Sequence, residues 1–147
     1  MLNQAVILAG GLASRLNTHY ENLPKCLVEI GGVKLLENLY RSIADSGLTK
    51  IHLLLGHKSE QVVKEIDKCD FHYGTKTTYS IEKFQLGTGG SLLSSLSYLE
   101  DKFLLIYGDL YIDTDLSQIT RNIEDSGFDF IQLVHPNNHM FDSDMVV

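Results

Sequence analysis

QAVILAGG, residues Gln4 to Gly11, carries the clearest structural signal in this sequence. Its apolar run shows no polar alternation and closes on two glycines, which is typical of a strand buried on both faces of a parallel sheet. The glycine pair lets the backbone turn tightly, so that consecutive N–H groups can face an anion. Residues 10–24 after the strand are polar and irregular, and connections of this length are often functional.

Helix and strand patterns alternate along the rest of the chain. A helical stripe from Leu35 to Ile43 ends at a glycine cap, Gly47. We expect further strands at 51–55, 77–81, 103–107 and 128–134, and further helices over 59–68, 92–99 and 116–123. This order predicts an α/β fold, a Rossmann-like three-layer α/β/α architecture with a mostly parallel sheet.

One short pattern, Arg-x-Ile-x-Asp-Ser-Gly-x-x-x-Ile, occurs at residues 41–51 and again at 121–131. Each copy reads as a helix, a glycine cap and a strand. We interpret the repeat as one local turn used twice rather than as a duplication.

The composition excludes several classes of protein. The 147 residues suit one domain, and 12 Lys and Arg against 19 Asp and Glu argue against a general nucleic-acid binder. No apolar run approaches the roughly 20 residues of a membrane span, and no basic segment precedes the first apolar run. Cys26 and Cys69 form no metal-type pair, so we expect a cytoplasmic protein without disulfides.

Phosphate binding is the chemistry that the first loop suggests. Arg15, in the segment Leu8–Leu16 (LAGGLASRL), can fork onto phosphate oxygens, and Lys25 adds a compact charge after Pro24. The alternative is a tight turn with a solvated arginine and lysine. The segment lacks both the G-x-G-x-x-G dinucleotide fingerprint and the P-loop pattern.

These blocks together resemble the sugar-nucleotidyltransferase family. Further matching blocks are Gly31-Gly32 with Leu35-Leu36-Glu37, Leu86–Gly90 (LGTGG), and Tyr107-Gly108-Asp109. The chain is most similar to the mannose- and heptose-type sugar-1-phosphate guanylyltransferases, and the ending 135–144 resembles the heptose branch. Such enzymes join a nucleoside triphosphate and a sugar 1-phosphate, release pyrophosphate and form a nucleotide-sugar for polysaccharide biosynthesis.

The resemblance implies a role for particular residues. Arg15, Lys25 and Asp109 would be catalytic, with Asp109 holding Mg²⁺ as the cofactor. Asp109 follows a buried strand at the end where open α/β sheets place ligands, although Gly-Asp is also a common turn. Nucleotide contacts are implied for Leu8, Ala9, Gly10, Gly11, Ser14, Glu82, Gly87 and Thr88.

Glu82 bears on the choice of base. Guanine offers two donors on one edge, and a carboxylate can accept from both. Uracil and thymine offer one donor between two acceptors, which suits an amide better. Glu82 therefore favours GTP over UTP or dTTP. An exposed glutamate at a strand end is the alternative, and Gln85 could shift the register.

Some residues depart from the family pattern. Ala13 stands where the family usually has glycine, which would strain a left-handed backbone by about 1 kcal/mol. Cys26 stands where proline is frequent, and a small buried side chain is favoured there over a reactive thiol. Asp113 and Asp115 read as helix caps. His135 and His139 flank Pro136, which disfavours a helical metal pair.

Length is the largest departure. Family catalytic domains are longer, and their sugar-phosphate lysine and second metal carboxylate would lie beyond Val147. We therefore expect residues 1–147 to be the nucleotide-binding portion of a nucleotidyltransferase domain, truncated at its C-terminal side. A non-catalytic nucleotide binder and a dinucleotide oxidoreductase are the alternatives. Leucine- and tyrosine-rich helices leave room for a homodimer.

Overall fold

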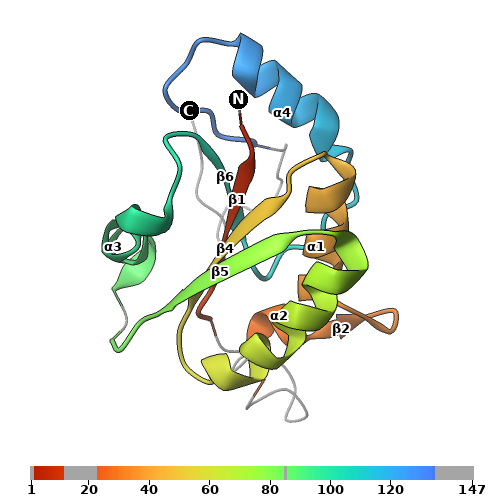
Figure 1. Cartoon of the computed structure of the whole chain (residues 1–147), viewed down its shortest axis with the longest axis vertical. Helices are drawn as coiled ribbons and strands as arrows, with labels where there is room; N and C mark the ends of the chain where they lie inside the picture. The colour runs from red at the N-terminus through yellow and green to blue at the C-terminus, as the bar shows by residue number, and fades with distance from the viewer. Residues whose placement is uncertain (1, 12–22, 85, 135–147) are drawn as a thin grey trace, which may run out of the picture.

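A parallel sheet forms the centre of the molecule. The computed structural model describes residues 2–11, 23–84 and 86–134. The sheet has the order β5-β4-β1-β6 (Figure 1). Its strands are β1 (Gln4–Ala9), β4 (Lys50–Leu55), β5 (Lys76–Ile81) and β6 (Phe103–Tyr107). Because β1 lies between β4 and β6, its apolar run is buried almost throughout, as the sequence predicts.

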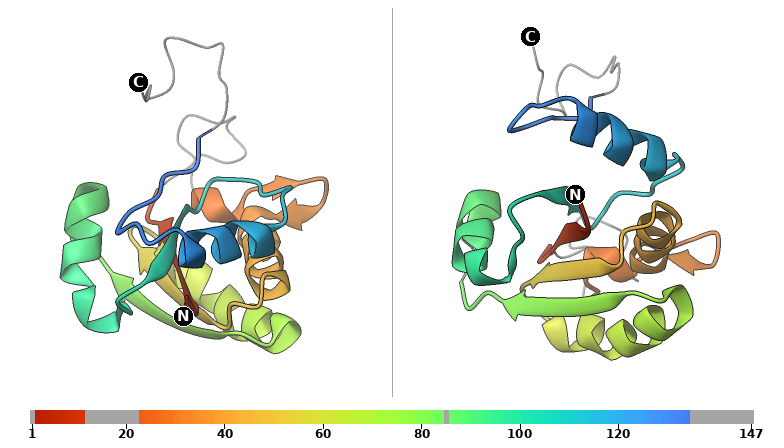
Figure 2. Two further views of the ribbon diagram at one scale, coloured as in Figure 1. Left: turned by 90° about the horizontal axis from the view of Figure 1, so that it is seen from above. Right: turned by 45° about the horizontal axis from the view of Figure 1, so that its top comes forward.

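Helices cover both faces of this sheet. Helices α1 (Leu35–Asp45) and α2 (Ser59–Tyr73) lie on one side and α3 (Gly87–Ser94) lies on the other (Figures 1 and 2). Helix α4 (Leu116–Asp125) packs against α1. The three layers confirm the predicted α/β class. The remaining elements are η2 (Lys25–Leu27), η3 (Leu96–Tyr98) and the hairpin β2 (Glu29–Ile30) with β3 (Val33–Lys34).

The two faces of the central strands differ in chemistry. Ile7 and Leu53 belong to the apolar core, together with Leu39 of α1. On the opposite face His52 is fully buried and bonds the hydroxyl groups of Thr78 and Ser80 at 2.7 and 3.2 Å. The central strands β1 and β4 therefore have one dry apolar face and one face that carries a buried polar network.

Close backbone approach explains the glycines at the carboxyl ends of the strands. A Cβ on Gly108 would lie 2.8 Å from the carbonyl oxygen of Leu8, and one on Gly56 would lie 2.9 Å from that of Gly10. Neither Gly10 nor Gly11 has a positive φ. A Cβ on Gly10 would lie 3.4 Å from the Gly56 amide nitrogen, which is an ordinary contact, so the close approach requires glycine at position 56 rather than at position 10.

The predicted strand at 128–134 is wrong, because the structure has no regular element there. Gly47 and Gly127 both adopt the left-handed conformation, with φ of 86° and 69°, so the repeated pattern does give the same helix cap twice. Only the first cap leads into a strand, β4, which pairs with β1. A strand needs a neighbour for its N–H and C=O groups, and residues 128–134 pair with none of the described strands.

Two predicted helices have different ends. The helix expected over 92–99 begins earlier, at Gly87, and ends at Ser94, so the glycine-rich segment forms its first turn. Helix α2 continues to Tyr73, where Gly74 caps it. None of the helices within the described residues has the length and apolar character of a membrane span.

Candidate functional site

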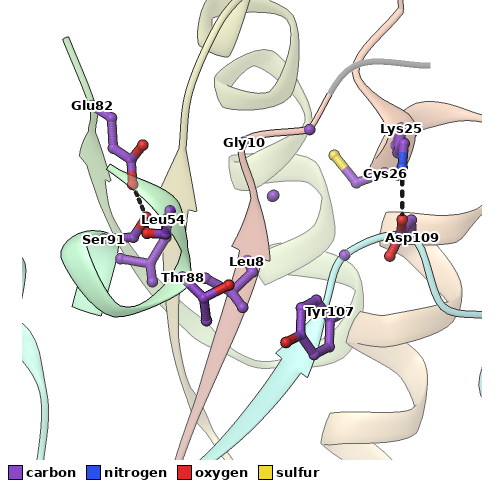
Figure 3. A pocket seen from close by; sticks show the side chains of 14 residues that line it. Leu8, Gly10, Lys25, Cys26, Leu54, Glu82, Thr88, Ser91, Tyr107 and Asp109 are labelled. Carbon is purple, nitrogen blue, oxygen red and sulfur yellow. Dashed lines mark hydrogen bonds and ion pairs between the residues drawn. The ribbon is translucent and has the colours of Figure 1, made fainter. Parts of the chain in front are cut away.

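A cavity of about 460 Å³ opens at the carboxyl ends of the central strands (Figure 3). The chain passes from β1 to β4 on one side and later returns to β6 on the other, and open α/β sheets bind ligands at such a switch point. The volume lies within the range of small-molecule sites. The cavity is lined by Leu8, Ala9, Gly10, Gly11, Lys25, Cys26, Leu54, Glu82, Gly87, Thr88, Ser91, Tyr107, Gly108 and Asp109.

The structure brings together every predicted site residue that it describes. Lys25, Glu82 and Asp109 come from three separate parts of the chain and meet at this cavity. Predictions for Ser14 and Arg15 fall outside the described residues, as do those for Ala13 and for the histidines at 135 and 139.

One end of the cavity carries opposite charges. The Lys25 amide donates to the carbonyl oxygen of Gly11 at 3.0 Å, so the chain that leaves β1 returns beside it. The Lys25 ammonium then lies 3.0 Å from Oδ2 of Asp109, with the two side chains 40% and 43% exposed. A cation and a carboxylate thus stand together, accessible to solvent, at the end of β6 (Figure 3).

The opposite end of the cavity holds a lone carboxylate. Glu82 follows β5, and its amide donates to the carbonyl oxygen of Leu55 at 2.9 Å, which extends the β4–β5 ladder by one bond. Its Oε1 accepts a hydrogen bond from the hydroxyl group of Ser91 in α3 (Figure 3). The base-reading residue predicted from the sequence therefore lies in the cavity rather than on open surface.

The two ends match an elongated ligand. Glu82 follows β5 and Asp109 follows β6, and these strands are the two edges of the four-stranded sheet. Neighbouring strands lie about 4.8 Å apart, so three spacings separate the ends by about 14 Å. A nucleotide has hydrogen-bond donors at its base and negative charge at its phosphates. Its base suits the Glu82 end and its phosphates suit the Lys25 end.

Cys26 is a buried core residue and not a reactive thiol. It is 1% exposed, and burial, with a smaller effect of the Asp109 charge, raises the pKa of its thiol to about 12. The thiol is therefore protonated at neutral pH, although it lines the cavity next to Lys25. Both cysteines are free and buried, and the burial of Cys26 confirms the prediction for that residue.

Asp109 is the carboxylate that suits a metal in this cavity. Mg²⁺ is usually held by one or two carboxylates with phosphate oxygens and water, and an accessible Asp109 beside a phosphate-sized space fits that donor set. No group of three or more His, Cys, Asp and Glu in the described part of the chain could hold a metal by itself. Asp115 caps α4 by accepting from the Ser117 amide at 2.8 Å, as predicted. Asp113 is not the cap.

Sequence reasoning assigned no role in the site to four of the lining residues, Leu54, Ser91, Tyr107 and Gly108. Leu54 and Tyr107 lie at the carboxyl ends of β4 and β6, so their place in the strands was a usable signal. Ser91 comes four residues after Gly87, one helical turn along α3. That spacing points to the cavity only once the helix is known to begin at Gly87.

With this geometry established, comparison with known proteins identifies the family. Residues 5–141 match the model of the MobA-like NTP transferase domain. The chain belongs to this family of nucleotidyltransferases.

Particular relatives narrow the resemblance. The chain is 36% identical over 119 residues to a D-glycero-alpha-D-manno-heptose 1-phosphate guanylyltransferase of Campylobacter jejuni, covering 81% of this chain and 53% of that protein. It is 29% identical over 131 residues to the UTP–glucose-1-phosphate uridylyltransferase AglF of Haloferax volcanii, covering 89% and 53%. HddC of Yersinia pseudotuberculosis, solved with GMP-PN, superposes with a TM-score of 0.71 at 34% identity, covering 84% and 55%. The chain thus spans about half the length of these relatives.

Proposed function

We propose that the protein transfers a nucleoside monophosphate from a nucleoside triphosphate, with GTP favoured, to a sugar 1-phosphate of the mannose or heptose type. The sugar-phosphate oxygen would attack the α-phosphorus in line as the bond to pyrophosphate breaks, which yields a nucleotide-sugar. The observation that carries this proposal is a single cavity with an accepting carboxylate, Glu82, at one end and Lys25 with Asp109 at the other. The heptose-type guanylyltransferase relative and the HddC structure solved with GMP-PN support the choice of base.

Catalysis would consist of positioning and charge neutralisation, without a covalent intermediate on the protein. Lys25 would neutralise charge at the α-phosphate, and Arg15 would steady the leaving pyrophosphate. The backbone of Ala9, Gly10 and Gly11 would approach the phosphates. Asp109 would hold Mg²⁺, which when bound supplies positive charge against the phosphate oxygens.

The nucleotide contacts that we propose follow from the two ends of the cavity. Leu8 and Thr88 lie between them (Figure 3) and, with Gly87 of the lining, would contact the nucleoside, while Glu82 would accept from the guanine edge. Ser14 would add a hydroxyl group to the phosphate loop. We treat residues 1–147 as the nucleotide-binding portion of the domain, acting in the cytoplasm on substrates for polysaccharide biosynthesis, with a homodimer as the proposed assembly.

A second candidate function is nucleotide binding without turnover. The observation that favours it is Ala13, which stands where the family usually has glycine. This candidate predicts GTP binding without pyrophosphate release, whereas the main proposal predicts both. A dependence on UTP, as in the name of the AglF relative, is the other base choice.

The test combines binding with turnover. We would measure the melting temperature of the chain with Mg²⁺ and each of GTP, UTP, dTTP, CTP and ATP. A ligand at 100 times its dissociation constant adds about 2.7 kcal/mol, which is several degrees for a domain of this size. Pyrophosphate release is then assayed with mannose or heptose 1-phosphate. A rise with GTP and release of pyrophosphate support the proposal, whereas no rise with any nucleotide refutes it.

A further inference from the structure

Ser91 makes a contact that the proposed function does not use. Its side chain is buried, with 7% exposure, in a cavity whose other polar side chains are more open to solvent. Its hydroxyl oxygen lies within hydrogen-bond distance of two acceptors, Oε1 of Glu82 and the carbonyl oxygen of Gly87, the latter at 2.8 Å. A buried hydroxyl group therefore points at the Glu82 carboxylate, which faces the cavity.

The hydroxyl group has one proton and two acceptors to choose between. Serine in a helix often donates to the carbonyl oxygen four residues earlier, which here is Gly87. A carboxylate is the stronger acceptor, because hydrogen bonds to charged groups are about twice as strong as neutral ones. The Ser91 hydroxyl group therefore donates its proton to Glu82, so a residue of α3 holds the carboxylate.

Other described groups hold Glu82 only weakly through its side chain. The Leu86 amide lies 3.5 Å from Oε2, at the limit of a hydrogen bond. The hydrogen bond from the Glu82 amide to the carbonyl oxygen of Leu55 fixes the backbone and leaves the side-chain torsions free. Ser91 is thus the strongest polar contact that fixes the direction of this carboxylate in the described part of the chain.

Orientation matters for reading a base edge. The donors of guanine, N1–H and the exocyclic amine, lie side by side in one plane, so both carboxylate oxygens must point along that plane at once. A carboxylate has about four lone-pair sites. Ser91 occupies one of them on Oε1, which leaves both oxygens able to accept from the base.

We propose that Ser91 is a positioning residue for base selection, which orients the Glu82 carboxylate so that it accepts from both donors of a guanine edge. This inference rests on the proposed function, because it assumes that Glu82 reads the base. It adds a residue from α3 that sets how strongly guanine is preferred over a base with one donor on this edge.

The experiment compares GTP, ITP and UTP. The hypoxanthine base of ITP keeps N1–H but lacks the exocyclic amine, so the ratio of the ITP to GTP dissociation constants reports the second hydrogen bond. Dissociation constants are measured by calorimetry with Mg²⁺ on the full chain. The variants are Ser91→Ala, Glu82→Gln, their double mutant and the matched control Ser94→Ala. Ser94 lies in the same helix, and among the described residues its hydroxyl group bonds the carbonyl oxygen of Ser91, at 2.8 Å.

We expect Ser91→Ala to lower the preference for GTP over both ITP and UTP by about 10-fold, the lower end of the range for one hydrogen bond to a charged group. UTP affinity stays within about twofold, since UTP does not use the oriented carboxylate. Ser94→Ala changes nothing. In the Glu82→Gln background the Ser91 substitution has no further effect on the preference, because the two residues act as one unit.

Each remaining outcome overturns a distinct statement. If Ser91→Ala behaves like Ser94→Ala while Glu82→Gln abolishes the GTP preference, Glu82 reads the base and Ser91 does not position it. If Ser91→Ala weakens all three nucleotides equally, the role of Ser91 is structural. If the unmodified chain shows no preference for GTP, the guanylyltransferase proposal fails and the inference about Ser91 fails with it.

Discussion

Replacing Lys25 with alanine separates ligand binding from folding. Lys25 and Asp109 form an ion pair at 3.0 Å with both side chains about two-fifths exposed. Two unit charges at that distance attract by about 1.4 kcal/mol in water. Salt and side-chain ordering reduce this, and measured surface pairs contribute about 0.2–1 kcal/mol. Lys25→Ala should therefore lower the melting temperature of the ligand-free chain by at most about 2–4 °C.

The effect on ligand binding should be much larger. A lost hydrogen bond to a charged group weakens binding by about 30-fold. At a GTP concentration 100 times the original dissociation constant, the stabilisation by GTP falls from about 2.7 to about 0.9 kcal/mol. The measurement is the melting temperature with and without GTP and Mg²⁺. Turnover should fall by roughly 10²-fold or more.

The matched control is Lys50→Ala, since Lys50 forms an exposed ion pair with Glu100 at the amino end of β4, away from the cavity. It should leave the shift caused by GTP unchanged. An undiminished GTP shift in Lys25→Ala refutes the assignment of Lys25 to the phosphates. A loss of several kcal/mol in the ligand-free variant refutes the argument that the pair contributes little to stability.

Three further predictions follow from particular contacts. Asp109→Asn removes the negative charge that pairs with the Lys25 ammonium, so the affinity for nucleotide without Mg²⁺ should rise. The increase in affinity caused by added Mg²⁺ should disappear, because the carboxylate that would hold the metal is gone. Titrations with nucleotide in the presence of Mg²⁺ or of a chelator measure both effects. Asp115→Ala removes the cap of α4 and should lower the midpoint of chemical denaturation, without changing GTP affinity. Burial raises the pKa of Cys26 to about 12 and of Cys69 to about 11, so a thiol reagent at pH 8 should label neither until denaturant is added. Since both raised values favour the neutral thiol in the folded state, this contribution to stability is complete below about pH 9 and declines as the pH rises through 11 and 12.

Local pattern was sufficient for most elements. The run at β1, the stripe of α1 and its cap at Gly47 are properties of neighbouring residues, and each forms as predicted. The strand predicted at 128–134 does not form, because a strand depends on residues outside its own segment. Its apolar residues can form a strand only beside a partner, and nothing in the segment itself indicates whether a partner is present.

The sequence identified residues of the site correctly, but it did not give every physical reason for which they are there. Gly10 was expected for a turn, and the structure adds that its backbone lies so close to residue 56 that only glycine fits there. Glu82 was chosen for its hydrogen-bonding pattern, and the structure adds the contact with Ser91 that no spacing rule on the sequence alone would assign.

The sequence alone therefore carries the α/β class, the family resemblance and the residue types suited to phosphates and a guanine edge, because each depends on short contiguous segments. Tertiary structure decides which of those residues meet. Lys25 contacts Asp109 across 84 residues of chain, and it does so because β1 and β6 are neighbours in the sheet. Pairing between distant segments is set by packing of the whole sheet and its helices, which no single segment encodes.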